Sequence, residues 1–315
     1  MRVVTAAEID RALTFPALID ALAEAFRSDI VTPARHHHEI ARAESPATLL
    51  LMPAWTGPTG GRGFVGVKIV SVYPDNAQRS LPSVFGTYLL LDGATGEPLA
   101  AMDGTRLTLW RTAAASALAA RHLAREDASR MVMVGAGALA PFLIRAHAGE
   151  RPIRHVALWN HRPEKTVRLA AELSTAGLPV EPVADLEAAV READLVSCAT
   201  LSTAPLVKGA WLKPGVHLDL VGAFNLTMRE ADDEALRRAE VYVDTAAARR
   251  EGGDVALGLK GGTIADQDVK GDLADLCRGN VPGRGRPDEI TLYKSVGTAL
   301  ADLAAAVEVW ARTGR

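Results

Sequence analysis

The alternation of apolar and polar positions divides the chain into regions of different expected structure. After Thr5-Ala6-Ala7-Glu8, which fits a capping box, apolar residues recur at roughly helical spacing as far as Phe26. We therefore expect two short helices before Pro33. From about 47 to 102 the pattern changes to short β-type runs, namely ATLLLMPAW, FVGVKIVSVY, SVFGTYLLL and EPLAAM, separated by turns rich in Gly and Pro. This N-terminal third predicts a mostly antiparallel sheet flanked by helices.

The middle of the chain follows a different rhythm. A helix rich in small residues is predicted at 105–124, and strands then alternate with helices. The expected strands are 131–135, 155–159, 179–183, 194–200, 216–222 and 241–245, and the expected helices include 138–148, 163–176 and 229–238. Such alternation indicates a parallel sheet with helices on both faces. After a loop at 278–289 that we expect to be flexible, the chain ends in a predicted strand and a long helix that packs back on the N-terminal domain.

These patterns predict an α/β protein of two domains. A Rossmann-type doubly wound parallel sheet at 113–289 is expected to be inserted into a second α+β domain, formed by 1–112 together with 290–315. The length of 315 residues fits about 150 residues per domain. A chain of this size buries enough surface to need no disulfide or metal staple.

Composition and charge remove several classes of function. With 35 basic and 38 acidic residues and 5% aromatic residues, the chain has no overall attraction to polyanions, so we expect no nucleic-acid partner. Cys198 and Cys277 lie far apart without zinc-site spacing, which favours a reducing compartment. A secretion signal and an uncharged apolar run of 18 residues are both missing from the sequence. We therefore expect a cytoplasmic protein with no membrane partner.

A glycine-rich turn is the strongest local motif. Gly135-Ala136-Gly137-Ala138-Leu139-Ala140 fits G-x-G-x-x-A directly after a predicted strand and opens a predicted helix. Its glycines allow a dinucleotide pyrophosphate to approach the helix N-terminus. Where NAD sites place an acidic residue, this chain has Asn160, His161 and Arg162. An amide and a guanidinium accept a 2′-phosphate, which favours NADP(H) over NAD(H), although Arg162 as a solvated helix start is the alternative.

Three spaced cations, Arg35, Lys68 and Arg111, are candidates for binding a substrate anion. Lys68 lies in an apolar strand, where an unpaired ammonium is costly, so we expect it to meet a carboxylate of the protein or of a ligand. Intrachain salt bridges are the alternative for all three cations.

Other chemical motifs are weak or missing from the sequence. His36-His37-His38 would place positions 36 and 38 on one strand face, but nothing completes a site, so we expect no metal. The motifs G-x-S-x-G, the P-loop and H-E-x-x-H do not occur, which leaves hydrolase and kinase templates without support.

Three segments together resemble a known family: Arg111-Thr112-Ala113-Ala114-Ala115-Ser116, the turn at 135–140, and Lys294-Ser295-Val296-Gly297-Thr298-Ala299. With Gly66-Val67-Lys68 and DGATGEPLA in matching order, the chain resembles the ornithine cyclodeaminase and μ-crystallin family over essentially its whole length. The resemblance implies a homodimer joined through the substrate domain, and a small imino- or amino-acid substrate.

The resemblance also implies roles for individual residues. The substrate carboxylate would be held by Arg35, Lys68 and Arg111, with Leu50 and Ser83 as further substrate contacts. Catalytic roles would fall to Lys68, Arg111 and Thr227. The cofactor contacts would be Thr112, Gly135, Gly137, Ala138, Leu139, Asn160, His161, Arg162, Ala199, Thr200, Val221, Lys294 and Ser295.

Departures from the family pattern favour one reaction. Cyclodeaminases have a glutamate at the place of Leu50, an Asp within the segment corresponding to 224–227, and an Asp at the place of Asn160. Leu50 cannot compensate the δ-ammonium of ornithine, and the sequence WNHR at 159–162 is similar to the ketimine reductases that use NADPH. The resemblance therefore implies reduction of Δ1-pyrroline-2-carboxylate or Δ1-piperideine-2-carboxylate to proline or pipecolate, with Lys68, Thr227 or water as the proton donor.

Three other functions stay open at this point. An ornithine cyclodeaminase would release ammonia from ornithine without net use of the cofactor. An NAD(P)-dependent dehydrogenase of alanine or another amino acid would use the same carboxylate clamp in the opposite direction. A crystallin-like protein would bind NADPH without catalysis. Turnover of an imino acid, or its absence, separates these alternatives.

Overall fold

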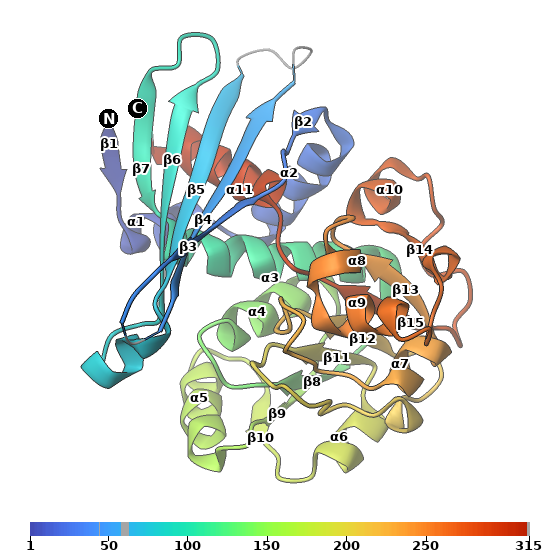
Figure 1. The fold of residues 1–315 in the computed structure, drawn as a ribbon. Helices are drawn as coiled ribbons and strands as arrows, with labels where there is room; N and C mark the ends of the chain where they lie inside the picture. The colour runs from blue at the N-terminus through green and yellow to red at the C-terminus, as the bar shows by residue number, and fades with distance from the viewer. Residues whose placement is uncertain (44, 58–62, 314–315) are drawn as a thin grey trace. The chain divides into compact units, whose positions relative to one another are not determined.

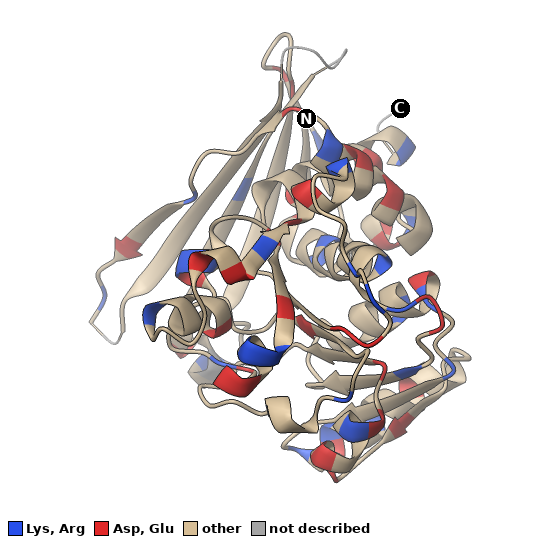
Figure 2. Ribbon diagram, turned by 90° about the vertical axis from the view of Figure 1, so that its right-hand side faces the viewer, with Lys and Arg blue, Asp and Glu red and all other residues tan. Residues whose placement is uncertain are grey.

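The chain folds into two compact units. The computed structural model describes residues 1–43, 45–57 and 63–313 (Figure 1). Unit 1 comprises Met1–Arg111 and Thr298–Arg315, and unit 2 comprises Thr112–Gly297. Acidic and basic positions are interspersed along the helices and loops of both units, while the long strands carry few charges (Figure 2). None of the helices in the described ranges is long and apolar enough to cross a membrane.

Unit 1 is built on a mostly antiparallel sheet, as the alternating pattern predicted. Neighbours β4, β5, β6 and β7 are antiparallel, β1 runs parallel to β7 at one edge, and β2 and β3 both pair with β4. The strands are β1 (Arg2–Val4), β2 (Ile30–Val31), β3 (His36–Ile40), β4 (Ala47–Thr56), β5 (Phe64–Val72), β6 (Val84–Asp92) and β7 (Pro98–Asp103).

Helices cover one face of this sheet (Figure 1). Helix α1 (Ala6–Ala12) begins at the predicted capping box, in which the Thr5 backbone N–H donates to the Glu8 carboxylate at 2.8 Å. The C-terminal helix α11 (Ala299–Thr313) packs on α2 (Phe15–Arg27) and on the central strands β4, β5 and β6. It therefore belongs to the N-terminal unit, as expected from its small residues. A short 3₁₀ helix, η1 (Pro74–Arg79), precedes β6.

Unit 2 contains a parallel sheet of the Rossmann type. Its order is β10-β9-β8-β11-β12-β15-β13-β14, and its neighbouring strands run parallel to one another. Its strands β8, β9 and β11 are largely apolar, because helices cover both faces of such sheets. The strands are β8 (Arg130–Val134), β9 (His155–Trp159), β10 (Val180–Pro182), β11 (Leu195–Cys198), β12 (His217–Leu220), β13 (Ala239–Val243), β14 (Val269–Asp272) and β15 (Ile290–Lys294).

Long helix α3 (Gly104–Leu123) continues from unit 1 into unit 2, and shorter helices follow the strands. They are α4 (Ala140–Glu150), α5 (Pro163–Thr175), α6 (Leu186–Glu192), η2 (Gly209–Trp211), α7 (Asp233–Arg238), α8 (Ala248–Glu251), α9 (Gly253–Lys260), η3 (Asp266–Asp268) and α10 (Leu273–Arg278). Most predicted elements agree with these bounds within a few residues. The sequence pattern did not predict the individual elements of 246–277, because the helices and the strand there are all short.

One predicted domain boundary is wrong. We expected residues 290–315 to complete the N-terminal domain, but strand β15 lies in the sheet of unit 2, between β12 and β13. All five residues of β15 are buried there. The pattern of a lone apolar strand followed by a helix does not reveal which sheet the strand joins. Only the part from Thr298 onward returns to unit 1.

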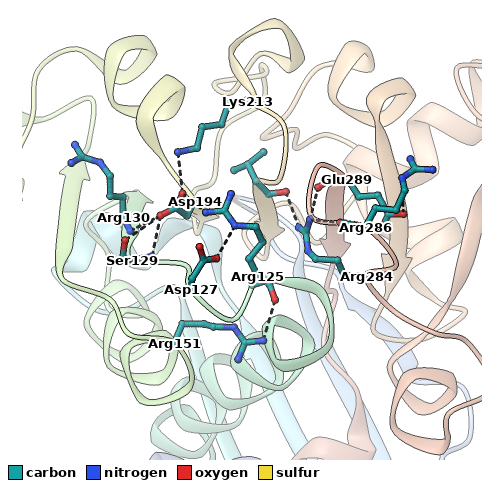
Figure 3. A network of polar contacts seen from close by, with 12 residues as sticks. Arg125, Asp127, Ser129, Arg130, Arg151, Asp194, Lys213, Arg284, Arg286 and Glu289 are labelled. Atoms are coloured by element: carbon teal, nitrogen blue, oxygen red, sulfur yellow. Dashed lines mark hydrogen bonds and ion pairs between the residues drawn. The ribbon is translucent and has the colours of Figure 1, made fainter.

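Buried and half-buried polar side chains fix the ends of the elements in unit 2. Asp194, before β11, accepts the backbone N–H groups of Ser129 and Arg130 and forms an ion pair with Lys213 at 3.0 Å (Figure 3). Arg284 donates from Nε to the Leu123 carbonyl at the end of α3 at 2.7 Å. The segment 278–289 is thus a loop, as predicted, but hydrogen bonds tie it to the fold, contrary to the flexible loop that we expected.

Candidate functional site

The glycine-rich turn connects β8 to α4 in the predicted manner. It lies at the carboxyl end of β8, beside β11, where the strand order reverses and open α/β sheets bind their ligands. Gly135 has φ +112°, and a Cβ there would lie 2.6 Å from the Ala199 carbonyl oxygen. Only glycine fits this position. A Cβ on Gly137 would meet open space, so a ligand can approach the turn closely.

A cavity of about 560 Å³ opens beside this turn, wholly within unit 2. Seven of the residues predicted to contact a cofactor line it: Gly135, Gly137, Asn160, His161, Arg162, Ala199 and Thr200. Lys165, in the first turn of α5, lines it too and was missed, because a lysine at a helix surface carries no sequence signal of its own. Glycines at one wall and amide and cationic side chains at another fit a dinucleotide and its phosphates.

The remaining predicted cofactor residues lie outside this cavity. Ala138 and Leu139 lie just before α4, whereas Thr112 and Val221 are buried. Lys294 is fully buried, with its Nζ 3.1 Å from Asp254 Oδ2. The Ser295 hydroxyl donates to a carboxylate, Asp244 Oδ2, at 2.9 Å. Both side chains thus already have protein partners in unit 2, and their contact with a cofactor stays a prediction.

Glu230, a residue that the sequence did not single out, joins the two loops beside the cavity. Its Oε1 accepts the Thr200 backbone N–H at 2.7 Å and the Thr200 hydroxyl at 2.9 Å. Its Oε2 accepts the backbone N–H groups of Gly222 and Ala223 at 2.7 and 3.1 Å. The loops that follow β11 and β12 are therefore held by one buried carboxylate. A glutamate in a polar loop segment gives no indication of this in the sequence.

A second buried carboxylate supports the first. Asp254 accepts the backbone N–H groups of Glu230 and Ala231 at 2.7 and 3.0 Å, and it pairs with Lys294. Burial raises the pKa of Glu230 to about 7, the nearby charge of Lys294 acts to lower it, and that of Asp254 raises it. The hydrogen-bonding capacity of Glu230 therefore changes near neutral pH.

In unit 1, two of the three candidate cations converge on one carboxylate. Lys68 Nζ lies 2.7 Å from Asp302 Oδ2 and 2.9 Å from Oδ1, and Arg111 Nε donates to Oδ1 at 2.8 Å. All three side chains are buried. Tyr88, directly opposite Lys68 in the β5–β6 register, is buried as well. The expectation that Lys68 meets a carboxylate is confirmed, and the carboxylate comes from the protein itself.

Burial and charge act against each other in this cluster. The pKa of Lys68 is lowered to about 8, mainly by burial and also by the charges of Arg111 and Arg35, while Asp302 acts to raise it. Burial acts to raise the pKa of Asp302, but Arg111 and Lys68 together bring it below its ordinary value. Burial and then the charge of Asp302 raise the pKa of Tyr88 well above its ordinary value. Lys68 therefore loses its proton at a lower pH than an exposed lysine does.

The other predicted substrate residues, Arg35, Leu50 and Ser83, also belong to unit 1. In the β4–β5 register, Met52 lies opposite Lys68. Leu50 is two residues from Met52 along β4, so it lies on the same face of the sheet as Lys68. Arg35 is half-buried just before β3, and its charge acts on Lys68. Ser83 precedes β6 and accepts the Tyr73 backbone N–H through its carbonyl.

Thr227 lies in unit 2 and the histidine run lies in unit 1. In unit 2, the Thr227 hydroxyl is exposed and donates to Asn225 Oδ1 at 2.8 Å. In unit 1, His36 and His38 share a face of β3, as predicted, with ring centroids 6.2 Å apart. Within the described residues, no group of three or more His, Cys, Asp or Glu side chains could hold a metal ion.

A family comparison identifies the origin of this arrangement. The model of the ornithine cyclodeaminase/mu-crystallin family matches residues 1–314. The chain belongs to the ornithine cyclodeaminase/mu-crystallin family. The resemblance inferred from the Arg111, Gly135 and Lys294 segments is thereby confirmed.

Individual family members show what related proteins do. The chain is 35% identical to the Δ1-pyrroline-2-carboxylate reductase of Colwellia psychrerythraea over 315 residues, 98% of each chain. Its structure matches that of Thermococcus litoralis Δ1-pyrroline-2-carboxylate reductase in complex with NADH and L-proline, with a TM-score of 0.92, 31% identity, and coverage of 99% of this chain and 97% of that one. It also matches an archaeal alanine dehydrogenase dimer with bound NAD, with a TM-score of 0.90, 29% identity, and coverage of 99% and 95%.

The titration of Glu230 predicts a pH dependence of cofactor binding. Below its pKa of about 7, Glu230 is protonated and accepts the four N–H and O–H donors less well, so the loops after β11 and β12 loosen. NADH affinity, measured by fluorescence titration, should fall severalfold from pH 8 to pH 6. NADH is chosen because it lacks a titrating 2′-phosphate.

Glu230→Gln should bind NADH more weakly than the wild type at pH 8 and should show little change between pH 8 and pH 6. Glu234→Gln, an exposed glutamate in α7, is the matched control and should keep the wild-type profile. An unchanged pH dependence in Glu230→Gln would contradict this role of Glu230.

Proposed function

We propose that this chain reduces a cyclic ketimine carboxylate, Δ1-pyrroline-2-carboxylate or Δ1-piperideine-2-carboxylate, to the corresponding cyclic amino acid. Such an enzyme is an NAD(P)-dependent oxidoreductase that acts on a C=N bond. The observation that carries the proposal is the buried cluster of Lys68, Arg111 and Asp302, joined in one chain with a dinucleotide turn. The similarity to Δ1-pyrroline-2-carboxylate reductases along nearly the whole chain supports it.

The cationic cluster suits a single substrate carboxylate. Arg111 uses Nε for Asp302, which leaves the two terminal amino groups of its guanidinium outside that contact. Lys68 and Arg111 together carry one positive charge more than Asp302 compensates. A carboxylate between an ammonium and a guanidinium gains charge-assisted hydrogen bonds of about 1.5–3 kcal/mol each. Arg35 is proposed as a third contact, because its charge acts on Lys68.

Reduction of the imine needs a hydride at C2 and a proton at the ring nitrogen, which together give a secondary amine. A bound reduced nicotinamide supplies the hydride. Among the candidate proton donors, Lys68 is favoured, because burial lowers its pKa to about 8, close to the pH at which a general acid works best. The Thr227 hydroxyl donates to Asn225 instead. After proton transfer, neutral Lys68 is reprotonated from solvent.

The chemistry of the cavity favours NADP(H) over NAD(H). Asn160 stands where NAD sites have an acidic residue, and Arg162 and Lys165 line the same cavity. Three neutral or cationic side chains favour a 2′-phosphate, which a carboxylate would repel. The related structures hold NADH or NAD. The preference for NADP(H) is therefore proposed from the residues of this chain alone.

We further propose that the chain forms a homodimer through unit 1. The related alanine dehydrogenase is a dimer. On unit 1, the large apolar side chains of Leu81, Val84 and Phe85 are between 45% and 50% exposed around the start of β6. Clustered exposed apolar side chains are typical of interaction surfaces.

Alanine dehydrogenase activity is the second candidate function. It is favoured by the structural match at a TM-score of 0.90 and requires the same carboxylate clamp. Ornithine cyclodeaminase activity is disfavoured, because Leu50, on the face of Lys68, cannot compensate a δ-ammonium. Net oxidation of NADPH by a cyclic imine in the absence of ammonia separates the proposed reaction from both.

Loss of NADPH absorbance on mixing with Δ1-pyrroline-2-carboxylate or Δ1-piperideine-2-carboxylate tests the reaction. Rapid oxidation without added ammonia is expected, together with proline or pipecolate as the product. Lys68→Ala and Arg111→Ala should raise KM and lower kcat together while NADPH affinity changes little, because both residues bind the substrate. Ammonia release from ornithine, or NADPH oxidation only with pyruvate and ammonia, would overturn the proposal.

The cofactor preference is tested by replacing the cavity cation. Arg162→Ala should weaken NADPH binding about 10-fold or more through the lost charge-assisted contact, and should leave NADH binding nearly unchanged. Arg168→Ala, at an exposed arginine in α5, which begins directly after Arg162, is the control for loss of a surface charge. Equal losses for both cofactors in Arg162→Ala would show that Arg162 does not read the 2′-phosphate.

A further inference from the structure

Asp302 lies fully buried between two cations of the proposed substrate clamp. Its Oδ1 receives both Lys68 Nζ and Arg111 Nε, at 2.9 and 2.8 Å, so the two cations are close neighbours on one oxygen. Three elements meet there: β5 brings Lys68, α3 brings Arg111 and α11 brings Asp302. Tyr88 faces the same group from β6, and Arg35 acts on it from the segment before β3.

The carboxylate is what allows two cations to share a buried site. Like charges that lie close together in a buried site disfavour each other's charged form, and burial disfavours both. A guanidinium is not deprotonated in proteins, so the lysine is the member of such a pair that would become neutral. A neutral Lys68 would hold a substrate carboxylate less well and would have no proton to give.

We propose that Asp302 is a positioning residue of the substrate site, which orients the Lys68 ammonium and the Arg111 guanidinium and keeps Lys68 charged so that both receive one substrate carboxylate. This inference rests on the proposed function. Asp302 does not touch the substrate in this account, since its oxygens face the two cations.

The same contacts join α11 to the sheet and to α3, so loss of Asp302 also affects folding. A test must therefore include a readout that a purely structural role would not change. The ionisation of Lys68 is such a readout, because Asp302 raises its pKa toward the ordinary value while Arg111 and Arg35 lower it. Lys68 is protonated below its pKa, so any loss of the Asp302 charge moves the loss of the ammonium to lower pH.

Two measurements on the full-length protein test the inference. The first is kcat/KM for imine reduction with NADPH between pH 6 and pH 10. The second is the titration of the Lys68 ¹³Cε resonance by NMR, assigned by its loss in Lys68→Met. In the wild type both should change near pH 8. The ionisation of the imine itself affects all variants alike, so differences between variants report on the enzyme.

Asp302→Asn keeps the shape and removes the charge. We expect its alkaline limb in kcat/KM and its Lys68 titration to move down together by at least one pH unit, with kcat/KM about 100-fold lower at pH 8. Asp302→Glu keeps the charge and moves it, so its limb should stay near pH 8 while kcat falls at least 10-fold. Asp219→Asn, a matched change at a buried carboxylate in unit 2, should leave the limb in place.

Each alternative outcome is distinct. Uniformly lower activity in Asp302→Asn with an unmoved limb and an unmoved Lys68 titration would reduce Asp302 to a structural residue. Wild-type activity in Asp302→Glu would contradict the positioning role, even if Asp302→Asn fails to fold. If the wild type reduces neither imine, the proposed function fails, and the NMR titration still decides whether Asp302 sets the charge of Lys68.

Discussion

The proposed active site depends on the compensation of buried charge in unit 1. An ammonium and a guanidinium cannot both remain charged away from water unless a carboxylate joins them, and Asp302 provides it at 2.7 to 2.9 Å. Strand β5 presents Lys68, and the C-terminal helix returns to the same sheet with Asp302. The surplus positive charge is then available for a substrate carboxylate.

Unit 2 uses buried charge in a similar way. Glu230 binds the loops after β11 and β12 through four hydrogen bonds, and Asp254 and Lys294 lie behind it. The loop after β11 forms part of the cavity wall next to the glycine turn. In both units, then, the residues that we propose to bind a ligand, or the loops beside them, are held by fully buried carboxylates. A change in the protonation of such a carboxylate, or of the cation that it holds, therefore changes the geometry of the proposed binding site.

The sequence predicted what short-range patterns encode. The capping box at Thr5, the G-x-G-x-x-A turn at Gly135 and the two kinds of sheet follow from local spacing, and the structure has them. The need of Lys68 for a carboxylate also followed, because an isolated cation in an apolar strand is costly. Among the segments that carry the family resemblance, one is this turn and two contain the clamp residues Lys68 and Arg111.

The partners of these residues could not be predicted from sequence. Asp302 is 234 residues from Lys68, and only the folded chain brings them together. Glu230 and Asp254 lie in segments without a distinctive pattern. Strand β15 was assigned to the wrong unit, because an apolar strand is compatible with either sheet until its pairing with β12 and β13 is known.

The central claim is that Lys68 and Arg111 hold the substrate carboxylate while Asp302 holds them. A crystal structure of the enzyme with NADP⁺ and L-proline tests it most directly. We expect the proline carboxylate within hydrogen-bonding distance of Lys68 Nζ and of a terminal amino group of Arg111, with both cations still bonded to Asp302. A proline carboxylate bound elsewhere, with Lys68 and Arg111 contacting Asp302 alone, would contradict the account.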